Sequence, residues 1–166
     1  MRNFQRTLLS AAALLAAVVA PSGVRAFDRW YAGASAALVL PQGGAGMRHL
    51  AGATARFGYY MTETFALDGG AAWLEDRAGL SARALWHLQG WEAWGKLFGY
   101  ERFDPFLTAG VQGWLPRGQV GPTCGFGALY YLSETWALRA DADVTLGLDA
   151  GAAAVFALSA GVQYSF

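Results

Sequence analysis

The sequence predicts an all-β fold, an eight-stranded antiparallel up-and-down transmembrane β-barrel, and three observations lead to this prediction. Bulky apolar residues alternate with small or polar residues along most of the chain after residue 26. This period of two is typical of strands and not of helices. An aromatic hairpin sequence occurs twice, 71 residues apart. Eight alternating runs follow one another, each of about ten residues, the length that a tilted membrane-spanning strand requires.

The repeated hairpin covers residues 59–68 and 130–139. In each copy, two aromatic runs flank a short polar turn, Thr62-Glu63 in the first and Ser133-Glu134 in the second. Tyr, Phe, Trp and Leu suit a pleated sheet, and Ser, Thr and charged residues suit the turn. A hairpin that recurs at this period indicates four strands per half of the domain and eight in all.

Residues 1–26 are expected to be a secretory signal peptide. Arg2 and Arg6 precede an apolar run at residues 8–20, and Val24-Arg25-Ala26 has the spacing of a cleavage site. The run is shorter than the roughly 20 residues of a membrane-spanning helix. Residues 27–166 then form one barrel domain.

The charge and the cysteine content exclude several classes of partner. Three of the 12 Lys and Arg residues lie in the leader and all 12 Asp and Glu residues lie after it, so the mature chain has a net charge of −3. Nucleic-acid binding requires a clustered basic face, so no nucleic-acid partner is expected. Cys124 is the single cysteine, and neither a disulfide nor a metal site is expected.

The first four strands are expected at residues 29–40, 49–60, 65–73 and 79–89. The Pro-Gln-Gly-Gly sequence at 41–44 ends the first strand, the Thr62-Glu63 turn the second and the charged residues 75–77 the third. The fourth strand alternates most clearly, with Leu85 as the one exception on its polar face. The aromatic segment 90–104 that follows fits either an extension of the strands or a short helix.

The last four strands are expected at residues 105–114, 123–132, 136–144 and 156–166. Pro116-Arg117-Gly118 ends the fifth strand, and Gly147 to Gly151 forms the turn before the last. In the seventh strand, apolar Trp, Leu, Ala and Val positions alternate with one Arg and two Asp positions. The connections 41–48, 75–78, 116–121 and 147–151 are short, which disfavours a large binding surface.

The distribution of bulk between the two faces indicates a membrane protein. The bulky residues share one face of each strand, while Gly, Ser, Thr, Ala and a few charges share the other. The interior of an eight-stranded barrel is only just filled by side chains, so small and polar residues fit inside and bulky apolar residues face lipid. Six inward charges balance and are expected to pair across the lumen and plug it: Arg56, Asp68, Arg83, Arg139, Asp141 and Asp143. A relay or a small ion pathway is the alternative.

Aromatic residues near the strand ends are expected to form girdles at the two membrane interfaces. The proposed girdle residues are Trp30, Tyr59, Phe65, Trp73, Trp86, Trp114, Tyr130 and Trp136. Trp73 and Trp114, with Phe156, are expected at one rim and the others at the opposite rim.

No catalytic site and no cofactor are expected. His49 and His87 are the only histidines, and His49 is expected to be interfacial. Ser81 lies six residues before His87, about 20 Å along a strand, which is too far for a nucleophile–base contact. Cys124 is expected to face lipid as a small apolar side chain. An enzyme is therefore not expected.

Several segments resemble the small eight-stranded outer-membrane β-barrels, in particular the transmembrane domain of outer membrane protein A and the opacity-type surface proteins. These are the opening Trp30-Tyr31-Ala32-Gly33-Ala34, the two hairpin turns, residues 104–111 and the final strand. Val162, Tyr164 and Phe166 are similar to the terminal signal that the barrel assembly machinery reads. The resemblance implies a location in the outer membrane, both termini in the periplasm, and outer-membrane lipids as partners.

The sequence thus favours a monomeric outer-membrane protein with a structural or surface role and a lumen plugged by side chains. A small-solute channel or porin-like transporter is one alternative, and a surface adhesion or ligand-binding protein is another. A soluble periplasmic barrel is the alternative at the level of the fold.

Overall fold

The computed structural model describes residues 30–41, 50–62, 64–75, 77–88, 102–115, 119–147 and 154–166. The expected signal peptide, His49, Glu63 and most of segment 90–104 lie outside the described residues. No helix among the residues described is long and apolar enough to cross a membrane.

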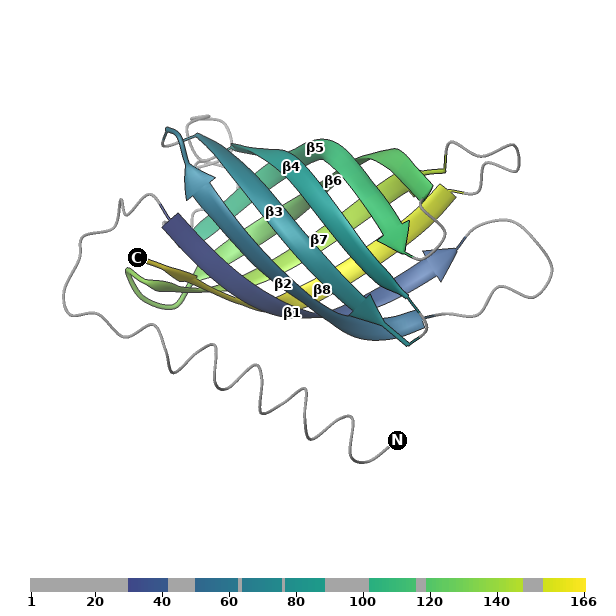
Figure 1. Cartoon of the computed structure of the whole chain (residues 1–166). Coiled ribbons are helices and arrows are strands. Elements are labelled where there is room, and N and C mark those ends of the chain that lie inside the picture. Colours follow the sequence, from purple (N-terminus) through teal and green to yellow (C-terminus); the bar gives the residue numbers. More distant parts are fainter. Residues whose placement is uncertain are drawn as a thin grey trace, which may run out of the picture.

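Eight antiparallel strands close into a barrel in which each strand pairs with its neighbour in sequence and the last pairs with the first. Figure 1 shows that the strands are tilted and that the C-terminus lies at the end of the barrel where the first strand begins. The eight-stranded up-and-down fold expected from the sequence is confirmed. The strands are β1 (Trp30–Pro41), β2 (Leu50–Tyr60), β3 (Phe65–Leu74), β4 (Ala78–His87), β5 (Phe103–Leu115), β6 (Gln119–Tyr131), β7 (Trp136–Leu146) and β8 (Ala154–Ser165).

The two copies of the repeat form equivalent hairpins, β2–β3 and β6–β7. The Met61 amide donates to the Phe65 carbonyl (2.9 Å), and the Leu132 amide donates to that of Trp136 (2.8 Å). In the first turn the Thr62 hydroxyl accepts from the Thr64 amide, and in the second the Ser133 hydroxyl accepts from the Thr135 amide, as the polar composition predicts. We call the end of the barrel that carries these two turns and the C-terminus the turn end, and the opposite end the loop end.

Two of the expected connections are shorter in the structure. Phe103 and Asp104 belong to β5, and Gln119 to Gly121 belong to β6. The prediction was wrong there because residues 90–104 and 116–121 were assigned to connections, whereas Pro105 and Pro122 both lie within strands. Proline lacks a donor but its carbonyl still accepts, and Leu88 donates to the Pro105 carbonyl (2.8 Å). The fourth strand also ends at His87, two residues earlier than expected.

The two faces of the barrel differ as the alternation predicts. Bulky side chains point outward, with Phe126 65% exposed and Leu80 61% exposed, while Leu85 is buried inside. Glycines make room for the large inward rings. A Cβ added to Gly58 would overlap the Tyr31 ring, and one on Gly127 would overlap the Phe106 ring. Small residues on the inner face are therefore a condition for filling this narrow interior.

Candidate functional site

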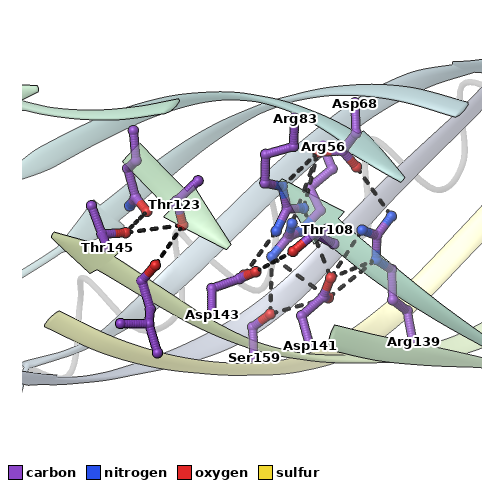
Figure 2. A network of polar contacts seen from close by, with 12 residues as sticks. Arg56, Asp68, Arg83, Thr108, Thr123, Arg139, Asp141, Asp143, Thr145 and Ser159 are labelled. Carbon is purple, nitrogen blue, oxygen red and sulfur yellow. Dashed lines mark hydrogen bonds and ion pairs between the residues drawn. The ribbon is translucent and has the colours of Figure 1, made fainter. Parts of the chain in front are cut away.

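The interior of the barrel is divided into three layers, with charged residues between two apolar groups. At the turn end lies an apolar group formed by Tyr31, Ala66, Leu85, Phe106, Leu129 and Ala137. At the loop end lies a second apolar group formed by Val39, Leu50, Leu74 and Trp114. We refer to the six charged side chains between them as the charge layer: Arg56, Asp68, Arg83, Arg139, Asp141 and Asp143 (Figure 2).

Asp68 on β3 lies at the centre of the charge layer. Its carboxylate accepts from Arg83 Nη2 at 3.0 Å and from Arg139 Nη1 at 3.1 Å. Arg56 Nη1 is more distant, at 3.9 Å. The side chain of Asp68 has no exposed surface, so these arginines replace the water that would otherwise solvate its charge. The two repeat copies thus place an Asp and an Arg at equivalent positions, and these side chains bond to each other across the lumen.

The two remaining carboxylates come from β7. Asp141 accepts from Arg139 Nη2 at 2.9 Å, and Asp143 accepts from Arg83 Nη1 at 2.8 Å. Arg56 reaches Asp141 only at 3.6 Å. Three positive charges therefore face three negative charges, and their side chains are at most 9% exposed. Charges this deeply buried are tolerated because each has an opposite charge and further hydrogen bonds around it.

Neutral side chains complete the hydrogen bonding of the charge layer. The Tyr31 hydroxyl donates to Asp68 (3.0 Å), and the Thr108 hydroxyl donates to Asp143 (2.9 Å). Gln163 accepts from Arg139 at 3.1 Å, and Ser159 accepts from Arg56 at 3.0 Å. These four residues were not among the site residues predicted from the sequence. The alternation places all four on inner faces, so an inventory of every inward polar position could have found them.

A second buried polar pair lies close to the turn end. His87 Nδ1 is 2.7 Å from Asp104 Oδ2, and the Tyr131 hydroxyl donates to the same oxygen (3.3 Å). Asp104 was missed because it was placed in the connection before the fifth strand. His87 points inward, as expected, but its acidic partner could be identified only from the register of β5.

Nε2 of His87 is buried and has no hydrogen-bond partner in the protein. Within the described part of the chain, therefore, no serine or cysteine is hydrogen-bonded to this nitrogen. The same residues contain no group of three or more His, Cys, Asp or Glu side chains that could hold a metal ion.

Trp114 corrects the expected aromatic girdle. It is only 8% exposed and packs inside the loop end with Val39, Leu50 and Leu74. The prediction was wrong because Trp114 was placed by its position near a strand end. The alternation along β5 gives the correct face, because Trp114 lies an even number of residues from the inward residues Thr108 and Gly110.

The other proposed girdle residues lie on the outer face or at the rim. At the turn end, rings from neighbouring strands contact one another: Trp30 and Tyr59 (4.6 Å between centroids), Phe65 and Trp86 (5.2 Å), Trp136 and Tyr164 (4.9 Å). Tyr130 is exposed in the same region, and Trp73 is exposed toward the loop end. Aromatic rings in such a band are typical of a membrane interface.

The C-terminal residues and the cysteine also lie on the outside. Val162 and Tyr164 alternate with inward Gln163, and the Phe166 amide donates to the Trp30 carbonyl (3.0 Å). This bond closes the barrel at the turn end. Cys124 is a free, exposed thiol on the outer face of β6.

Comparison with solved structures identifies the fold, whereas comparison of sequences identifies no relative. No protein-family model and no curated protein sequence matches the chain. Neisserial surface protein A superposes with a TM-score of 0.63 at 17% identity, over 82% of this chain and 97% of that one. The outer membrane protein OprG from Pseudomonas aeruginosa gives 0.61 at 13% identity, over 87% and 98%.

A designed transmembrane β-barrel gives a TM-score of 0.60 at 14% identity, over 86% of this chain and 100% of the designed one. These similarities rest on the shape of the barrel, since the identities are low. The chain therefore has the fold of the small eight-stranded outer-membrane β-barrels.

Proposed function

We propose that the chain is an integral outer-membrane protein whose barrel is closed by its own side chains and acts as a membrane-spanning scaffold. The observation that carries this proposal is the charge layer. Its six side chains are at most 9% exposed, so water scarcely reaches them from either end. Ions that crossed the lumen would have to separate arginine–carboxylate pairs at 2.8–3.1 Å.

The outer face supports the location in a bilayer. Large apolar side chains are exposed around the barrel, and in water an apolar surface of this extent would be unfavourable. Because the barrel is closed, no strand edge has unpaired backbone groups. A bilayer requires this, since lipid cannot hydrogen-bond to such groups. Under this proposal outer-membrane lipids cover the barrel, and β8 together with Phe166 is recognised by the assembly machinery. The turn end then faces the periplasm.

Planar-bilayer recording tests the closed lumen. The mature protein, refolded and shown by a heat-dependent gel shift to be inserted, is expected to give no steady conductance at neutral pH. Steady single channels would overturn the proposal in favour of a small-solute channel. The gel shift is the control, because it shows that an absence of conductance is not due to failed insertion.

Fractionation tests the location separately. The protein is expected with the outer membrane and to migrate differently before and after boiling. Recovery in the soluble periplasm, without a gel shift, would contradict a membrane location and favour a soluble barrel. If the protein has a surface-binding role, replacing the loop-end connections by minimal turns is expected to abolish its phenotype. If it is a scaffold, the variant with minimal turns is expected to keep that phenotype.

We infer that the barrel is not an enzyme. His87 and Asp104 resemble the base and orienting acid of a hydrolase, but no nucleophile is hydrogen-bonded to His87 in the described residues. The pair is instead explained as a structural hydrogen bond inside the turn end. Substitution His87→Ala is expected to change barrel stability without abolishing any hydrolytic activity of the preparation.

A further inference from the structure

A cavity of about 40 Å³ lies inside the barrel between the charge layer and the apolar group at the loop end. Its polar lining residues include Thr54, Arg56, Ser81, Gln112 and Trp114. A buried water needs about 10–15 Å³ of such space, so the cavity holds only a few atoms. It is therefore too small for an organic ligand and suits a monoatomic ion or a few waters.

Three polar atoms of the lining residues have no hydrogen-bond partner in the protein: Arg56 Nε, Trp114 Nε1 and Thr54 Oγ1. The only other such buried side-chain atoms in the described residues belong to His87 and Asp104. Arg56 and Trp114 are both more than nine-tenths buried. A buried N–H without an acceptor is unfavourable, so two of them on residues that line one cavity indicate that the cavity holds an acceptor.

Arg56 has the longest ion pairs of the three arginines in the charge layer. Its closest carboxylate oxygens are 3.6 Å and 3.9 Å away, whereas Arg83 and Arg139 have theirs at 2.8–3.1 Å. Arg56 donates instead to the neutral hydroxyl of Ser159 (3.0 Å). Among the charged residues that line the cavity, Arg56 and Arg83 outnumber Asp143. The guanidinium with the longest ion pairs thus borders the cavity, and two arginines beside one aspartate in its lining favour an anion over a neutral acceptor.

We propose that this cavity is a binding site for a small monoatomic anion of the halide class. Arg56 Nε and Trp114 Nε1 donate to the ion, and the Thr54 hydroxyl supplies a third donor. The ion accepts from the Nε–H of Arg56 and fixes the Trp114 indole in the loop-end apolar group. A many-atom anion such as gluconate does not fit the volume.

The indole resonance of Trp114 reports directly on the site. The ¹⁵N-labelled mature protein in detergent micelles is titrated with sodium chloride or bromide against sodium gluconate at constant ionic strength, and the substitution Trp114→Phe assigns the resonance. We expect a saturable shift of the Trp114 indole with either halide and none with gluconate. The indole of Trp73, exposed on the outer face, serves as the internal control. Equal shifts in halide and gluconate, or no saturation, would show that the cavity holds only water and would overturn the proposal.

A matched pair of hydroxyl deletions tests the geometry. Thr54→Val removes the third donor, and the halide affinity is expected to fall about tenfold, the size of one hydrogen bond to a charged group. Thr123→Val is the control, because Thr123 lies inside the same end but bonds to Thr145 and to the Val144 carbonyl. Equal loss in both variants would contradict the assignment. Should either variant fail to fold, a bromide anomalous peak in crystals of the unaltered protein decides: density in the cavity supports the site, and its absence overturns it.

Discussion

Asp68→Asn is the sharpest test of the charge layer. The amide keeps the shape of the side chain and an acceptor for the Tyr31 hydroxyl, but it removes the charge that Arg83 and Arg139 approach at 3.0 and 3.1 Å. In a buffer without halide, so that no anion occupies the cavity beside Arg56, three buried arginines then face two carboxylates. Removing one partner of a buried ion pair costs about 3–5 kcal/mol because the remaining charge is left uncompensated.

Urea unfolding in lipid vesicles, followed by tryptophan fluorescence and the gel shift, measures the decrease in the free energy of unfolding. With a slope of about 2 kcal/mol per molar urea, a loss of about 4 kcal/mol lowers the midpoint by about 2 M. Glu134→Gln, in the exposed β6–β7 turn, is the control and is expected to leave the midpoint unchanged.

A second substitution separates lost charge balance from lost contacts. Arg56 has the longest ion pairs of the three arginines, so Asp68→Asn combined with Arg56→Met leaves Arg83 paired with Asp143 (2.8 Å) and Arg139 with Asp141 (2.9 Å). This balanced double variant is expected to recover most of the lost stability. An unchanged midpoint for Asp68→Asn, or a double variant as unstable as the sum of both single variants, would refute the reasoning.

Three further predictions use matched positions. Trp114→Ala is expected to destabilise the barrel by about 3–5 kcal/mol in the same urea assay, because it empties the loop-end core, and Trp73→Ala on the lipid face by clearly less; equal losses would place Trp114 outside. Gly58→Ala forces the Tyr31 ring away from Asp68 and is expected to cost about 1–3 kcal/mol. Gly69→Ala on the adjacent strand, with its nearest contact at 3.7 Å, is the control and should be nearly neutral. Cys124 is expected to resist a water-soluble maleimide in vesicles and to react after unfolding in urea; labelling of the inserted protein would contradict a lipid-facing β6.

The sequence by itself determined the barrel and the face of almost every strand residue. Alternation has a period of two, so one outward Leu or Phe fixes the orientation of its whole strand, and the repeated turns fix the number of strands. The same rule correctly placed Leu85 inside and Cys124 outside. The alternation was not applied to Trp114, which was instead assigned to the outer girdle because it lies near the end of a strand.

Only the tertiary structure decided which inward residues meet. Alternation gives the face of a residue but not its height along the barrel axis, and height depends on the register between strands and on the tilt. The contact of Asp68 with Arg83 follows from direct pairing of β3 and β4, whereas its contact with Arg139 crosses the lumen. The pairing of His87 with Asp104 required β5 to begin two residues before Pro105, at Phe103. The cavity beside Arg56 is likewise a property of packing, because it exists where residues from seven strands fail to fill the space between two layers.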